Sequence, residues 1–185
     1  MRIITGLAKG CNLKTPKGMS TRPTSDRVKE SLFSILGSDA CGRVLDIFAG
    51  TGGLGLEALS RGADSCTFID KATTEIIADN AKHTRLADKC QILKGDVFAQ
   101  LRRLETAGQQ FDLVFCDPPY HQGLAHRALE QLENSQLLAP DAIVVMEYGG
   151  DEPELPATIR LQMVKNQQYG KTTQINFYHL PVEEG

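Results

Sequence analysis

From residue 43 onward, short apolar runs alternate with stretches of helical spacing. The apolar runs are RVLDIF, SCTFID, CQILKG, DLVFCD and AIVVMEY, and each has the length and composition of a buried strand. Helical spacing occupies about 54–61, 72–87, 97–107 and 123–134. This alternation predicts an α/β protein with a doubly wound, mostly parallel sheet. Residues 159–180 predict two more strands around Gly170-Lys171, an antiparallel hairpin at the sheet edge.

The first part of the chain follows a different pattern. Residues 1–16 contain two strand-like stretches around a Lys9-Gly10 turn, which indicates a small β-hairpin. Residues 22–37 have helical spacing, and three apolar residues share one side of that helix: Val28, Leu32 and Ile35. A proline precedes the helix, and either of two hydroxyl residues can cap it: Thr24 or Ser25.

Charge is distributed unevenly along the 185 residues, although the net charge is only −3. Residues 1–37 contain seven Lys or Arg and two acidic residues, a net +5, whereas residues 38–185 carry a net −8. A basic arm on an acidic body is typical of proteins that bind a phosphate backbone. A solvated charged segment gives the same pattern. We therefore expect residues 1–37 to be an extension of one main domain, residues 38–185, and charge alone leaves both interpretations of the extension open.

The cysteines indicate a reducing compartment. There are five of them, scattered and without a CxxC pair, so we interpret them as reduced thiols in a cytoplasmic protein. We find no signal peptide and no apolar stretch long enough to cross a membrane. His121 and His126 have poor spacing for metal ligands and no Cys or His cluster joins them, so we assign no metal site.

A glycine-rich stretch, LDIFAGTGGLGLEAL, begins in the first apolar run and continues into a helical stretch. Gly50, Gly52 and Gly55 have GxGxxG spacing, which is weak evidence alone but here lies between a predicted strand and a predicted helix. Such glycines let the backbone approach a ligand and let the helix pack on the strand. Asp70 ends the next strand, where a carboxylate meets the ribose hydroxyls of a bound nucleoside.

Charge helps to identify the nucleoside cofactor. Asp46 precedes Gly50 by four residues, and an anion there would repel the pyrophosphate of a dinucleotide but attract a cation. S-adenosylmethionine is a sulfonium with an ammonium group and no phosphates, so charge favours it over NAD. Asp96 closes the third strand at the same sheet edge. It can accept a hydrogen bond from an adenine amino group or cap the following helix, and the sequence leaves both open.

The stretch FCDPPY, residues 115–120, ends the fourth apolar run with two prolines, which cannot donate ladder hydrogen bonds. Methylation of an exocyclic amino nitrogen requires its delocalised lone pair to become localised. The Asp117 carboxylate and the Pro118 carbonyl, aimed at the amino N–H groups, favour that state, and Pro119 stiffens the turn. Tyr120 offers a ring on which a base can stack. We interpret the turn as catalytic; a plain strand stop with a surface tyrosine is the alternative.

Taken together, these stretches resemble the RsmD-type 16S rRNA (guanine-N2)-methyltransferases over nearly the whole chain. The matching motifs are RIITG, RPTSDRVKESLF, LDIFAGTGGLGLEALSRGA, FIDK and FCDPPY, and the RPTSDRVKESLF block is the most specific. The resemblance implies the Rossmann-like class I methyltransferase fold, with S-adenosylmethionine as cofactor. It also implies one guanine of the small ribosomal subunit as target, modified by a protein that we expect to be a monomer.

The resemblance assigns roles to individual residues. The implied cofactor-binding positions, beyond Asp46 and the three glycines, are Thr24, Arg27, Asp70, Lys71, Asp96 and Val97. Catalysis is implied at Asp117, Pro118, Pro119 and Tyr120. The stretch GLAKGCNL keeps only one basic residue where the family usually has several. We therefore expect RNA contacts to be shared among Arg2, Lys9, Lys14, Lys17 and Arg22.

Three other functions compete with this interpretation. An adenine-N6 DNA methyltransferase can use the same DPPY turn, but the chain has no room for a separate target-recognition domain. A nicotinamide-dependent oxidoreductase is disfavoured by DPPY and by Asp46. A non-catalytic RNA-binding assembly factor that has kept the fold is disfavoured by the intact DPPY turn.

Overall fold

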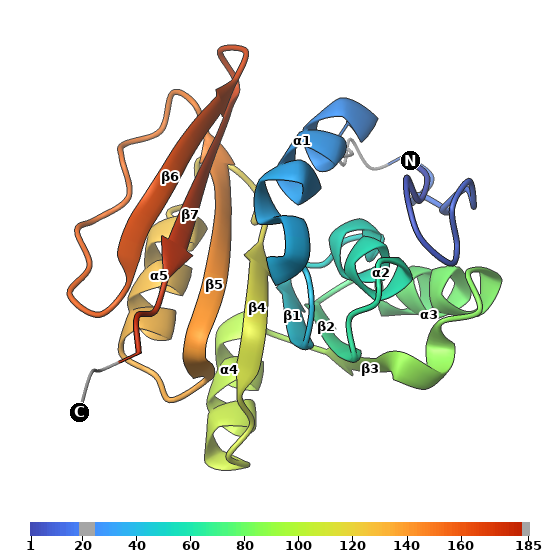
Figure 1. Ribbon diagram of the computed structural model, residues 1–185, viewed down its shortest axis with the longest axis horizontal. Coiled ribbons are helices and arrows are strands. Elements are labelled where there is room, and N and C mark those ends of the chain that lie inside the picture. The colour runs from blue at the N-terminus through green and yellow to red at the C-terminus, as the bar shows by residue number, and fades with distance from the viewer. Residues whose placement is uncertain (19–24, 183–185) are drawn as a thin grey trace.

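The protein is a single seven-stranded sheet with helices packed on both faces (Figure 1). The computed structural model describes residues 1–18 and 25–182. The strands are β1 (Arg43–Ile47), β2 (Ser65–Asp70), β3 (Cys90–Lys94), β4 (Phe111–Cys116), β5 (Leu138–Gly149), β6 (Gln162–Tyr169) and β7 (Thr173–His179). The α-helices are α1 (Asp26–Leu36), α2 (Gly53–Ser60), α3 (Thr74–His83), α4 (Val97–Thr106) and α5 (Leu124–Glu133).

The strand order confirms the predicted doubly wound α/β class. Across the sheet the order is β3-β2-β1-β4-β5-β7-β6. Strands β1 to β5 are parallel, and β7 pairs antiparallel with both β5 and β6, as the predicted C-terminal hairpin requires. The winding reverses between β1 and β4. Sheets of this kind bind ligands at the carboxyl ends of the strands beside such a reversal.

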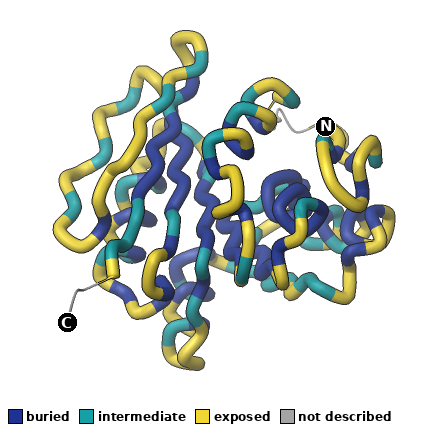
Figure 2. Tube along the Cα trace, viewed as in Figure 1, coloured by how far each residue is buried: buried dark blue, intermediate teal, exposed yellow. Residues whose placement is uncertain are grey.

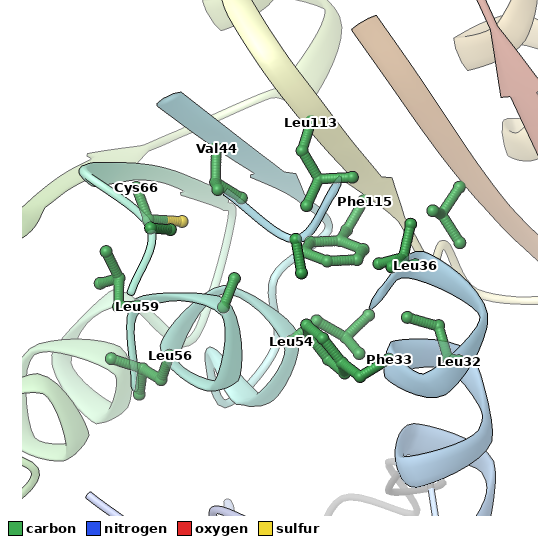
Figure 3. Packing of buried hydrophobic residues seen from close by; sticks show 14 of the residues in the cluster. Leu32, Phe33, Leu36, Val44, Leu54, Leu56, Leu59, Cys66, Leu113 and Phe115 are labelled. Carbon is green, nitrogen blue, oxygen red and sulfur yellow. The ribbon is translucent and has the colours of Figure 1, made fainter. Parts of the chain in front are cut away.

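Each face of the sheet carries its own hydrophobic cluster. The first cluster packs α1, α2 and α3 against the sheet, and the rings of Phe33 and Phe115 lie 5.6 Å apart in it (Figure 3). The second cluster packs α4 and α5 against the opposite face. Because both faces are covered, the central parallel strands are buried along most of their length, whereas edge strand β6 is largely exposed (Figure 2).

The N-terminal stretch forms a reduced hairpin instead of two extended strands. One antiparallel bridge joins Arg2 to Asn12, and the Ile3 N–H donates to the Cys11 carbonyl at 2.9 Å. Three apolar side chains of this stretch are buried in the first cluster: Ile3, Ala8 and Leu13. The strand ladder of the hairpin is therefore short, and buried side chains pack the hairpin onto the body.

Helix α1 begins where the sequence predicts, but its buried face differs. The Ser25 hydroxyl caps it by accepting from the Val28 N–H at 3.3 Å, while Thr24 lies outside the described residues. Val28 and Ile35 are only half-buried, and the buried face consists of Lys29, Leu32, Phe33 and Leu36. Helical spacing permits either stripe, and contact between Phe33 and Phe115 selects the second.

Glu57, on α2, is a fully buried carboxylate that holds the hairpin to the body. Its oxygens accept from the backbone N–H groups of Ile4 at 2.8 Å and Thr5 at 3.1 Å. Arg61 Nε donates to it at 2.9 Å from the next turn of the helix. A buried carboxylate is stable only when such donors replace its hydration, and Glu57 collects them from two segments of the chain.

Lys29, on α1, is the other charged partner of Glu57. Its Nζ lies 3.2 Å from the carboxylate and also donates to the Arg2 carbonyl, and its side chain is fully buried. Burial lowers the pKa of Lys29, against the opposing effect of Glu57. Lys29 therefore does not contribute to the basic surface that the charge count of residues 1–37 suggests. It fixes α1 to α2 and to the hairpin.

Asn80, on α3, connects the N-terminal segment to the loop after β1. Its side-chain oxygen accepts from the Lys14 N–H at 2.7 Å, and its Nδ2 donates to the carbonyls of Lys14 at 3.1 Å and Thr51 at 3.0 Å. The side chain is fully buried, so water cannot replace these bonds if they break. The Asn80 amide thus joins the N-terminal segment to the glycine-rich loop after β1.

We predict that Glu57→Ala destabilises the protein by about 3–5 kcal/mol, because it leaves Lys29 as an uncompensated buried charge. Urea unfolding followed by circular dichroism measures the change. The control is Lys14→Ala, which breaks the exposed 3.0 Å pair with Asp79 and should cost no more than about 1 kcal/mol. Equal losses in the two variants would contradict a central role for Glu57.

Candidate functional site

A cavity of about 710 Å³ opens at the carboxyl edge of the sheet, beside the reversal between β1 and β4. Its wall is built from strand ends, from the loops that follow them and from the N-terminal segment. The structure brings ten of the predicted site residues into this wall: Asp46, Gly50, Asp70, Lys71, Asp96, Val97, Asp117, Pro118, Pro119 and Tyr120. The two ends of the sequence pattern, the glycine loop and the DPPY turn, therefore face one space.

Four carboxylates of the wall lie on one face of the sheet. Asp46 pairs in register with Phe68 and Phe115, and Phe115 pairs with Val145. Side chains alternate between faces along a strand, so the acids two positions beyond those residues project on the same side as Asp46. Those acids are Asp70, Asp117 and Glu147. The cavity floor therefore carries four carboxyl groups, which suit cationic ligands.

The glycine loop lets the backbone approach the cavity. Gly50 has φ 59° and lines the cavity, and no atom lies within 4 Å of where its Cβ would be. Gly55 serves packing instead, since a Cβ there would lie 2.4 Å from the Phe68 ring and 2.6 Å from Cys66 Sγ. Gly52, with φ 81°, begins α2 and lies outside the cavity wall. Gly52 therefore sets the path of the backbone before α2, and Gly55 lets α2 pack closely on β2.

Asp70 organises the loops on either side of it. Its Oδ2 accepts from the Gly50 N–H at 3.0 Å, and its Oδ1 accepts from the N–H groups of Ala72 at 2.8 Å and Thr73 at 3.0 Å. The Thr73 hydroxyl donates back to the Gly50 carbonyl at 2.5 Å. Asp70 therefore holds the glycine loop in position; contact with ribose hydroxyls stays a prediction for this residue.

Asp46 is the most deeply placed acid of the site. It is only 2% exposed, and its Oδ2 accepts from the Gly55 N–H at 2.9 Å. Burial, and to a lesser degree the charge of Asp70, raise the pKa of Asp46 to about 8 against the lowering effect of that hydrogen bond. The carboxyl is therefore largely protonated at neutral pH until a cation approaches it. This refines the electrostatic argument made from the sequence, which assumed a permanent anion.

The DPPY turn follows β4 as predicted. Pro118 is buried, Pro119 is exposed, and Asp117 and Tyr120 are half-buried at the cavity wall. The Tyr120 hydroxyl donates to Glu147 Oε1 at 2.6 Å and lies 3.3 Å from Thr173 Oγ1. Burial and the nearby Glu147 carboxylate raise the pKa of Tyr120 well above its usual range. The Tyr120 side chain is thus a neutral phenol held in place by its hydroxyl. The sequence alone did not predict this hydrogen bond.

The remaining predicted cofactor residues occupy several positions. Asp96 caps α4 by accepting from the Ala99 N–H at 2.9 Å and also lines the cavity, so an adenine contact stays a prediction. Val97 is buried at the cavity wall and Lys71 is exposed there. Arg27 is exposed and lies outside the wall. Thr24 lies outside the described residues.

The predicted RNA-binding residues lie on the surface of the N-terminal segment. Arg2, Lys9, Lys14 and Lys17 are exposed, while Arg22 lies outside the described residues. Arg2 pairs with Asp26 at 2.9 Å, and Lys14 pairs with Asp79. Exposed pairs of this kind are weak and break readily when a phosphate competes. Their exposure is compatible with RNA binding, which stays a prediction.

The cavity wall also contains residues that were not singled out from the sequence, among them Lys29, Phe48 and Glu147. Phe48 follows β1 with φ 57°, an uncommon conformation for a non-glycine residue, and places its ring at the wall. Glu147 could have been found, because it is the one charged residue of the apolar run AIVVMEY. Lys29 could not, since its partner Glu57 is 28 residues away on another helix.

The strand order, the glycine loop and the cavity together define the Rossmann-like class I methyltransferase fold. The chain belongs to the family described as Conserved hypothetical protein 95, whose model matches residues 1–179. It is 39% identical to the Ribosomal RNA small subunit methyltransferase D of Haemophilus influenzae, over 83% of this chain and 81% of that protein. The resemblance to RsmD-type proteins is therefore confirmed.

Solved structures agree with this assignment. A hypothetical protein of Thermus thermophilus superposes with a TM-score of 0.82 at 29% identity, over 96% of this chain and 98% of that one. An RNA methyltransferase of Salinibacter ruber, in complex with S-adenosyl-L-homocysteine, gives a TM-score of 0.62 at 18% identity over 88% and 96% of the chains. At that identity the second similarity concerns the fold alone.

The described residues contain neither a cluster of metal ligands nor a helix that could cross a membrane. Within residues 1–18 and 25–182, no three His, Cys, Asp or Glu side chains are grouped so that they could hold a metal ion. Over the same ranges, every helix is too short or too polar to span a bilayer. All five cysteines are free thiols.

We predict that Asp46 makes the protein less stable as pH rises. Its folded pKa of about 8 exceeds the unfolded value of 3.8, so between these values the folded state binds the extra proton and stability falls with pH. The slope approaches the limit for one proton, about 1.4 kcal/mol per pH unit. Asp46→Asn is neutral at every pH and should remove this component. Urea unfolding of both proteins at several pH values measures it, and parallel curves would contradict the raised pKa.

Proposed function

We propose that this protein is an S-adenosylmethionine-dependent methyltransferase that methylates the exocyclic N2 of a guanine in 16S rRNA of the small ribosomal subunit. The observation that carries the proposal is the shared cavity. A rigid Asp117–Tyr120 turn lies at one part of its wall and a glycine loop with buried acids at another. The names of the curated relatives support small-subunit rRNA as the substrate class.

The cavity wall fits the cofactor. Its acidic floor suits a ligand with a sulfonium and an ammonium group, and Asp46 and Asp70 line it. Apolar residues suited to an adenine ring also line the cavity, namely Phe48, Val97, Phe98 and Leu124. The Gly50 backbone leaves room for close approach. When bound, S-adenosylmethionine supplies an electrophilic methyl group.

Asp117 and Pro118 act on the base. The carboxylate and the prolyl carbonyl are acceptors fixed by a turn that cannot extend the ladder. Directed at the two amino N–H groups of guanine, they favour the geometry in which the nitrogen lone pair is available for attack. Their positions are set before the base arrives, so little reorganisation is needed during the reaction.

Tyr120 holds the base. The target must leave its stack to enter the cavity, and single-stranded loops of structured RNA offer such bases. The Tyr120 ring, fixed by the bond from its hydroxyl to Glu147, gives a face for stacking. A stacked base gains on the order of 1–3 kcal/mol by comparison with single-strand binders.

The N-terminal extension provides the RNA contacts in this proposal. Residues 1–37 act as the RNA-binding extension, through Arg2, Lys9, Lys14, Lys17 and Arg22, and residues 38–185 form the methyltransferase domain. We expect the protein to work as a monomer in the cytoplasm, where small subunits are assembled. The exposed positions of the four described basic residues support this division.

We predict that the wild-type protein, given radiolabelled S-adenosylmethionine and undermethylated small subunits, forms N2-methylguanosine, and that Asp117→Ala lowers single-turnover methyl transfer by a factor of about 10²–10³. Affinity for S-adenosylhomocysteine should change little. The control, Asp64→Ala, removes an exposed acid at the amino end of β2 and should transfer normally. Nucleoside analysis showing methylated adenine in a parallel DNA sample, and none in rRNA, would refute the proposal.

We predict that the double variant Lys9→Ala, Lys17→Ala binds small subunits more weakly and with a smaller salt dependence. With fewer phosphate contacts, binding releases fewer counterions from the RNA. Cofactor affinity should not change, since neither side chain lines the cavity. Lys165→Ala with Lys171→Ala is the matched control, because it removes two exposed charges from the β6–β7 hairpin, outside the N-terminal segment. Filter binding at several salt concentrations compares the pairs. Equal losses would show that only net charge matters.

A further inference from the structure

We infer that Glu147 recognises the N1–H of the target guanine and so determines which base the enzyme accepts. The inference rests on the proposed function. It assigns a role to a residue that neither the glycine loop nor the DPPY turn contains. It also gives a role to the one acid within the apolar run at 142–148.

Glu147 lies beside Asp117, the acid proposed to act on the amino group of the base. Cys116 of β4 pairs in register with Met146 of β5, so the next residues along each strand, Asp117 and Glu147, lie next to one another. Both line the cavity. Asp46 lies on the other neighbour of β4, strand β1. Across the sheet, Asp117 therefore lies between Glu147 and the glycine loop. Glu147 is on the side of the DPPY turn away from the glycine loop, where the proposed mechanism requires the base.

The surroundings of Glu147 fix its orientation. The residue is 8% exposed, and its Oε1 accepts from the Tyr120 hydroxyl at 2.6 Å. A carboxylate has about four acceptor positions, so it can accept more than one hydrogen bond. The same hydroxyl ties the carboxylate to the ring proposed to stack on the base. Stacking and edge recognition are therefore set by one rigid unit.

The chemistry of the base edge selects guanine. The N1–H and the N2 amino group of guanine are adjacent donors. Asp117 and Pro118 accept from the amino group in the proposed mechanism, which leaves N1–H beside the neighbouring strand. Adenine and 2,6-diaminopurine carry amino groups too, but their N1 is an acceptor. An acceptor-only carboxylate would repel that lone pair, and a buried pair of unmatched acceptors is strongly disfavoured.

The test uses small subunits reconstituted with rRNA that carries 2,6-diaminopurine in place of the methylated guanine. This base keeps the N2 amino group but presents an acceptor at N1. We expect the wild type to prefer guanine by roughly 10- to 100-fold in kcat/KM. Glu147→Gln should reduce that preference by a similar factor, because its amide can donate to N1. A wild type that methylates both bases equally overturns the inference without any variant.

Tyr120→Phe separates recognition from support. If Glu147 only holds the Tyr120 ring, Glu147→Gln should leave the preference for guanine unchanged, because its amide oxygen still accepts from the Tyr120 hydroxyl. We expect that Tyr120→Phe keeps the preference for guanine, even if both rates fall. Equal loss of preference in the two variants, or a Glu147→Gln enzyme as selective as the wild type, overturns the inference. If the wild type forms no N2-methylguanosine at all, the proposed function fails first and the inference fails with it.

Discussion

In a parallel sheet every strand ends at the same edge, and alternate residues face the same side. The site depends on this constraint. Four strands, β2, β1, β4 and β5, each bring an acid to that edge on one face, and the loops that follow surround them. Residues that are 101 positions apart, Asp46 and Glu147, therefore share one cavity. The chemistry follows from register more than from any single motif.

A second constraint is the buried carboxylate of Glu57. It accepts from the hairpin backbone and from a side chain of α1, so the extension is part of the folded body. A positively charged N-terminal segment can thus serve two purposes at once. Lys29 balances the charge of the buried Glu57. The other described Lys and Arg residues of the segment lie on the surface.

The fold could be predicted because each strand and helix carries its own local signal. Alternation of runs gives the class, and the glycine and DPPY stretches give the edge at which the site forms. The side chains that connect distant segments could not be predicted. Glu57 stands in GLEAL, where helical spacing permits either an exposed or a buried acid, and only its partners decide. The sequence likewise assigned Asp70 and Asp46 to ligand binding. In the structure, both carboxyl groups also accept hydrogen bonds from backbone N–H groups of the glycine stretch, which no local pattern predicts.

The Asn80 amide has a thermodynamic consequence. It is bonded to the Lys14 backbone in the extension and to the Thr51 carbonyl in the glycine loop, so a displacement of one segment strains the other. If binding at one place displaces its segment, the free energy of binding at the second place changes as well. Linkage requires the effect to be reciprocal: whatever factor RNA imposes on cofactor affinity, the cofactor must impose on RNA affinity.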